Sequence, residues 1–126
     1  MSSTPHADIL ERLEEIVLDE NEIVTYRFVC KQWELHTNVA KQLLRDFCAI
    51  QKRNQRPVFA WYALSQSSSV MLVPETKLDR YQRHATSCHV YAVLQSRNED
   101  PFVIYAADMI NSLRGFYNLS SIEPLQ

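Results

Sequence analysis

The stretch TYRFVCKQWELHTNVAKQLLRDFCAIQKRN, residues Thr25 to Asn54, decides the fold that this sequence predicts. Its apolar residues recur at helical spacing, first over Tyr26 to Trp33 and then over residues 38 to 54. Thr25 and Thr37 stand where the caps of these two helices are expected. Two helices joined by so short a turn form a helix-turn-helix candidate, with the second in the position of a recognition helix.

A third helix is predicted before this pair, over residues 8 to 18. Charged residues occupy one side of it, and its apolar residues fall on a single stripe of a 3.6-residue helix. The stripe consists of Ile9, Leu10, Leu13, Ile16 and Val17.

After Pro57 the pattern changes to one of strands. Val58–Leu64 and Val70–Val73 predict a β-hairpin, or wing, around a serine-rich turn. A helix over Thr76–Arg83, a strand over Cys88–Gln95 and a short helix over residues 105–114 are expected to follow, the last ended by Gly115. The predicted fold is therefore α+β: a winged helix with an additional strand-helix-strand elaboration, forming one protein-interaction domain within residues 1–126 and folded over about 8–122.

Composition excludes several classes of function. Gly115 is the only glycine in 126 residues, so a P-loop, a dinucleotide-binding turn and a nucleophile elbow are all absent. The formal net charge is −2, which offers no general attraction to nucleic acid. The N-terminus lacks the pattern of a signal peptide and the longest apolar run is too short to span a bilayer, so we expect no membrane association.

No catalytic or metal-binding constellation is predicted. His84, Cys88 and His89 form the tightest group of ligand-type residues, but a structural zinc site needs a fourth ligand and paired spacing. We interpret Cys88 as a core thiol and His89 as a surface imidazole. Cys30 and Cys48 lie on apolar helical faces, where thiols are inert packing residues. The sequence thus predicts a protein without enzymatic activity, metal or cofactor.

The helix over residues 38 to 54 carries four basic residues that are candidate phosphate contacts: Lys41, Arg45, Lys52 and Arg53. The first two lie one turn apart and the others lie near the end of the helix. A nucleic-acid-binding winged helix is therefore the alternative hypothesis. A solvated helix face is the ordinary interpretation, and with it direct contact with DNA is weak or absent.

The strand Val58–Leu64 is apolar on both faces. Alternation puts Phe59 and Trp61 on one face and Tyr62 on the other, so both sides of this strand need cover. Either the domain's own helices supply both covers, or another protein supplies one of them.

Two motifs make the sequence similar to a known family. Asp19–Arg27 reads D-E-N-E-I-V-T-Y-R, and His36–Leu44 supplies a V-A-K-Q-L-L helix; further matches lie in Val58–Leu64, Lys77–Leu78 and His89–Tyr91. Together they resemble the N-terminal domain of the DNA polymerase delta subunit 3 family, from about Ile9 to Ile122.

The resemblance implies a nuclear, non-catalytic accessory subunit of DNA polymerase delta that supports DNA replication and repair synthesis. Its winged-helix domain would dock on the regulatory second subunit, and it would bind the sliding clamp only if a C-terminal tail exists beyond residue 126. A stable interface buries aromatic anchors under a polar rim. The candidate anchors are Tyr26, Trp33, Trp61 and Tyr62.

Overall fold

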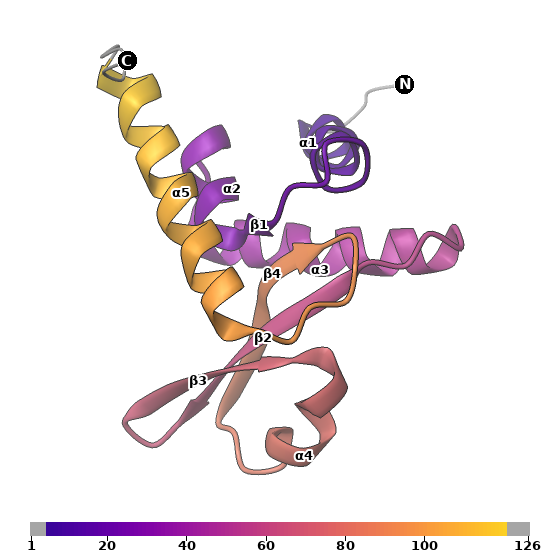
Figure 1. Cartoon of the computed structure of the whole chain (residues 1–126), viewed down its shortest axis with the longest axis vertical. Coiled ribbons are helices and arrows are strands. Elements are labelled where there is room, and N and C mark those ends of the chain that lie inside the picture. Colours follow the sequence, from indigo (N-terminus) through magenta and orange to yellow (C-terminus); the bar gives the residue numbers. More distant parts are fainter. Residues whose placement is uncertain (1–4, 121–126) are drawn as a thin grey trace.

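The structure is a computed structural model that describes residues 5–120, with side chains described for residues 6–110. The predicted α+β class is confirmed: helices cover a four-stranded antiparallel sheet (Figure 1). In chain order the elements are α1 (Pro5–Glu14), a π-helical turn η1 (Glu15–Asp19), β1 (Val24–Thr25), α2 (Tyr26–Trp33), α3 (Thr37–Arg53), β2 (Phe59–Gln66), β3 (Ser69–Pro74), a 3₁₀ turn η2 (Glu75–Lys77), α4 (Leu78–Gln82), β4 (Ser87–Leu94) and α5 (Pro101–Ser120).

The strands lie in the order β1-β4-β2-β3, so the hairpin of β2 and β3 forms one side of the sheet and β1 forms the opposite edge. β4 contains a bulge: Trp61 of β2 pairs with Ala92, whereas the next residue, Tyr62, pairs with Val90. Tyr91 is therefore an extra residue in β4. A bulge of this kind changes the face to which a side chain points, and Tyr91 and its neighbour Ala92 consequently pack into the same cluster.

One core lies between the sheet and the first three helices. It contains the side chains that the periodicity of these helices predicted to be buried, packed on Ala60, Val90 and Val93 of the sheet. Its fully buried large members include Leu13, Val17, Val29, Leu44 and Phe47.

A second core lies on the other face of the sheet, where α5 packs. Phe59, Trp61 and Ala63 of β2 meet Ile104 of α5 there, and the Trp61 indole Nε1 donates a hydrogen bond of 2.8 Å to the carbonyl oxygen of Asn98. The protein's own chain thus supplies cover on both faces of β2.

One of the two predicted N-caps is confirmed and the other is wrong. Thr25 caps α2 as predicted, its Oγ1 accepting from the amide of Phe28 at 3.3 Å. The prediction of Thr37 as the cap of α3 was wrong, because His36 Nδ1 accepts from the amide of Asn38 at 3.1 Å. A turn of three residues rather than four therefore separates the two helices.

The last helix is twice the predicted length. Asp100 accepts from the amide of Phe102 at 3.0 Å, and Pro101 occupies the first helical position, where a missing N–H has no consequence. The prediction that Gly115 ends this helix was wrong, since the helix continues to Ser120. The predicted end of the fold, at about residue 122, lies outside the described residues.

Candidate docking surface on the last helix

Helix α5 is apolar on almost every side over its first ten residues. From Phe102 to Ile110 its only charged residue is Asp108, and that residue is buried. Ile104 is completely buried in the second core. A helix that is apolar all round is normally enclosed on all sides, but this one is covered on one side only.

The outer side of α5 exposes large apolar side chains. Phe102 is 79% exposed, Tyr105 54%, Met109 67% and Ile110 49%. The first three are spaced i, i+3 and i+7, which puts them in one row along the helix. We call these four residues the outer face of α5. Exposed apolar side chains that gather in one patch mark an interaction site in a soluble protein.

Two grooves adjoin α5. One, of about 410 Å³, runs between α5 and the segment before β1 and is lined by Ile23, Val103, Ala106, Ala107 and Ile110 together with two polar residues. The other, of about 230 Å³, lies at the start of α5 between Pro101 and the β3 strand. The first groove includes Ile110 of the outer face, so the exposed side chains border a hollow that a complementary partner can fill.

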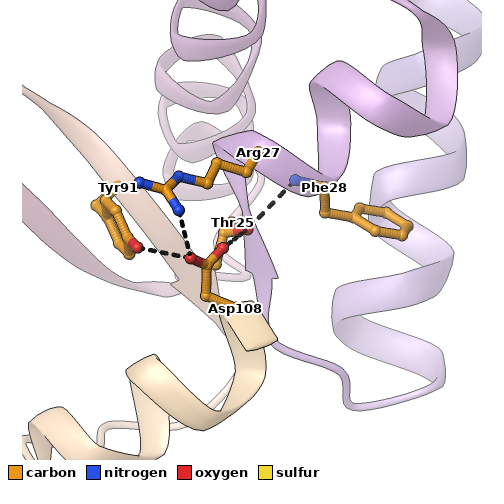
Figure 2. A network of polar contacts seen from close by, with 5 residues as sticks. All are labelled: Thr25, Arg27, Phe28, Tyr91 and Asp108. Atoms are coloured by element: carbon orange, nitrogen blue, oxygen red, sulfur yellow. Dashed lines mark hydrogen bonds and ion pairs between the residues drawn. The ribbon is translucent and has the colours of Figure 1, made fainter. Parts of the chain in front are cut away.

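A buried polar network anchors α5 to the sheet (Figure 2). Asp108 Oδ1 accepts from Thr25 Oγ1 at 3.0 Å, and Oδ2 accepts from the Tyr91 hydroxyl at 3.0 Å and from Arg27 Nη1 at 3.2 Å. The same Thr25 oxygen caps α2 through the amide of Phe28. One carboxylate thus ties α5 to β1, α2 and β4.

Tyr91 belongs to this network because of the bulge in β4, which leaves it unpaired with β2 and pointing toward α5. Burial, followed by the negative charge of Asp108 and the hydrogen bond to it, raises the pKa of Tyr91 to about 12. The phenol therefore stays protonated at neutral pH and serves as a donor to the carboxylate.

The structure does not bring the four predicted aromatic anchors together. Trp61 is buried in the second core, and its indole is hydrogen-bonded within the chain. Tyr26 is half-buried between the two cores, and Trp33 packs edge-on against Phe28 beside the first core. Tyr62 is half-buried on the sheet face opposite α5.

The four predicted basic residues of α3 have different surroundings. The Lys41 ammonium lies 5.3 Å from the centre of the Tyr26 ring, a cation–π contact. Arg45 and Lys52 line a cleft between α3, β2 and α4. Arg53 is exposed and lies outside that lining.

The predicted roles of Cys88 and His89 were reversed. Cys88 is exposed, whereas His89 is half-buried against the Tyr26 ring at 5.3 Å, because β4 turns the imidazole toward α2. Burial lowers the pKa of His89, and the nearby charge of Lys41 lowers it further. The imidazole is therefore a packing group of the domain rather than a surface residue.

The surroundings of all three thiols disfavour the thiolate form. Burial, with a smaller contribution from Glu75, raises the pKa of Cys48 to about 12, and burial also raises the pKa values of Cys30 and Cys88. Within residues 6–110 no three metal-ligating side chains gather into a site for an ion. None of the helices described has the length and apolar character needed to cross a bilayer.

Sequence reasoning missed the outer face of α5 and the role of Asp108. The sequence predicted a short helix over residues 105–114 and assigned no surface role to it. A signal was present: the segment from Phe102 to Ile110 is too apolar for one buried stripe, and its single acid has no basic residue at i±3 or i±4. That combination indicates a helix enclosed by more than its own domain.

Comparison with known proteins agrees with the motifs. No family model matches this sequence. Over 93% of its length the chain is 25% identical to DNA polymerase delta subunit 3 of Gallus gallus, and 26% identical to the proteins of the same name from Bos taurus and Homo sapiens. The chain spans 28% of the length of each of these relatives. The resemblance inferred from the motifs is thereby confirmed as a similarity over nearly the whole chain.

Proposed function

We propose that this chain is a docking domain of a non-catalytic, nuclear subunit of DNA polymerase delta, acting in DNA replication and repair synthesis. Its partner is the regulatory second subunit, and the contact is made by the outer face of α5. The observation that carries the proposal is the exposure of Phe102, Tyr105, Met109 and Ile110 on a single helix. Similarity to polymerase delta subunits supplies the complex in which such a surface would be covered.

The finer fold assignment belongs to the same proposal. In a winged-helix arrangement α2 and α3 are the helix-turn-helix pair, the hairpin of β2 and β3 is the wing, and η2, α4 and β4 are the elaboration. The short turn between α2 and α3 and the direct pairing of β2 with β3 support this assignment. Here α5 is an additional helix on the sheet face that α3 does not cover.

The energetics favour an apolar contact over a charged one. Phe102 and Met109 are large side chains that gain from removal from water, and the outer face carries no charge that would need a partner. Because the network around Asp108 already holds the helix in place, docking requires little further ordering of the chain.

The test is co-expression with the regulatory second subunit followed by purification at high salt, where surface charge pairs are screened. Phe102→Asp and Met109→Asp are expected to weaken binding by about thirtyfold or more, the loss typical of a central anchor. Val70→Asp is the matched control, because Val70 is an equally exposed apolar residue at the far end of the hairpin. Retention of the complex by both α5 variants would contradict the proposal.

A further inference from the structure

The cleft between α3 and α4 lies on the sheet face opposite the second core. It has a volume of about 500 Å³ and is lined by Arg45, Cys48, Ala49 and Lys52 of α3, by Pro57 and Val58, by Ala60 and Tyr62 of β2, and by Glu75 and Leu78. It shares no lining residue with the outer face of α5. A ligand of this cleft would therefore bind independently of a protein docked on α5.

Two cations stand at the α3 side of the cleft without acidic partners. Among residues 6–110, neither Arg45 nor Lys52 forms an ion pair, although Arg12, Arg27, Arg56 and Arg97 all do. They are seven residues apart on one helix, which separates them by about 10 Å along its axis. A single DNA strand carries more than one phosphate over such a distance, so one strand can contact both cations.

The rest of the lining suits a base better than a peptide. Tyr62 and Pro57 both line the cleft, and aromatic side chains such as Tyr62 stack on bases of any sequence. Glu75 is held in place because its Oε1 accepts from the amide of Ala60 at 2.8 Å. Its carboxylate repels acidic side chains and phosphates alike, but it can accept a hydrogen bond from the amino group of a base.

We propose that this cleft binds single-stranded DNA, with backbone phosphates on Arg45 and Lys52 and one base against Tyr62. A base paired within a duplex cannot enter a cleft of this shape without leaving its stack, so the single strand is the ligand. Only two phosphates are neutralised, so the site is a weak, salt-sensitive contact. It would guide a strand that other subunits hold.

The proposal is tested with the isolated chain and a short fluorescein-labelled oligodeoxycytidylate, followed by fluorescence anisotropy. Two phosphate contacts on a single strand predict a slope of about −1.4 for log K against log salt, a loss of roughly sevenfold between 50 and 200 mM salt. Arg45→Ala and Lys52→Ala are each expected to weaken binding by roughly fivefold, and Tyr62→Leu by at least as much because a stacking surface is lost.

Lys31→Ala is the matched control, since Lys31 is an exposed cation of α2 outside the cleft. It is expected to change affinity less than about twofold, the effect of net charge alone. An equal loss with Lys31→Ala, tighter binding of a duplex of the same length, or displacement of the DNA by polyglutamate at equal charge would each overturn the proposal. So would the absence of binding at low salt. Circular dichroism of every variant distinguishes loss of the site from loss of the fold.

Discussion

Helices α3 and α5 cover opposite faces of the same sheet, but they differ in which residues they bury and which they expose. α3 buries Leu43, Leu44 and Phe47 and exposes three of its four cations to the solvent. α5 buries Asp108, its one charged residue before Ile110, and exposes large apolar side chains. The apolar side of α3 is therefore covered within the domain, whereas large apolar side chains of α5 stay exposed, as expected of an interaction surface.

The largest effect is expected when a side chain on the buried side of α5 is shortened and compared with one on its exposed side. Ile104→Ala is expected to lower the free energy of unfolding by about 3 kcal/mol, because it removes a fully buried side chain and leaves a cavity. Met109→Ala, on the outer face, is expected to change it by less than about 0.5 kcal/mol. Urea denaturation followed by circular dichroism measures both. Equal losses in the two variants would mean that the outer side is packed within the domain.

The next largest effect is expected at the anchor of α5. Asp108→Ala leaves Thr25, Arg27 and Tyr91 without their acceptor, and we expect a loss of about 2 kcal/mol from the free energy of unfolding. Asp79→Ala, at an exposed carboxylate of α4, is the matched control and should be nearly neutral. Faster hydrogen exchange in α5 alone would show which element is released. A neutral Asp108→Ala variant would contradict the anchoring role.

Tyr91→Phe removes one donor to Asp108 and is expected to lower the free energy of unfolding by about 1 kcal/mol at pH 7. The pH dependence of this stabilisation gives a second test of the role of the phenol. Because the pKa of Tyr91 is raised to about 12 in the folded state, from an ordinary value of 10.0, the folded protein holds this proton more tightly than the unfolded chain. The stabilisation is present below pH 10 and is lost as the pH rises through about 12.

Denaturation of the parent chain and of Tyr91→Phe should therefore converge as the pH rises through this window. The other groups with raised pKa values, Cys48 and Tyr62 among them, are common to both proteins, so their contributions cancel in the difference. A constant difference between the two proteins from pH 7 to pH 12 would exclude the assigned role of the phenol.

The smallest expected effects concern helix ends. Glu34 ends α2 in the left-handed region, with φ of 53°, where glycine has no steric penalty. Gly115, in contrast, lies inside α5. Glu34→Gly and Gly115→Ala are therefore each expected to raise the free energy of unfolding by about 0.5 kcal/mol. Thermal unfolding detects such a gain as a higher Tm. A lower Tm for Gly115→Ala would instead indicate that the chain turns at Gly115 and that the helix ends there.

The elements that could be predicted are those that form because of interactions between residues close together in the sequence. The Thr25 cap, the helical spacing of Leu43, Leu44 and Phe47, and the strand around Trp61 all follow from neighbours along the chain, and the structure contains them. The error at Thr37 was also local, because the neighbouring His36 takes the capping position through its own side chain.

The candidate site could not be predicted because it depends on residues far apart in sequence. Thr25 and Asp108 are 83 positions apart, and no local pattern shows that they meet. The bulge that aims Tyr91 at them arises from the pairing of β4 with β2. The placement of Trp61 inside and of Phe102 outside likewise depends on which face of the sheet α5 covers.

Four features could be inferred from the sequence alone: the α+β class, the helical pair within Thr25–Arg53, the hairpin and the similarity to polymerase delta subunits. Each of these follows from periodicity, capping or a motif of adjacent residues. Which apolar residues form the core and which stay exposed on the outer face of α5 follows from the tertiary structure alone. Burial is a property of the assembled layers, and an apolar residue on a helix is buried only where another element covers it.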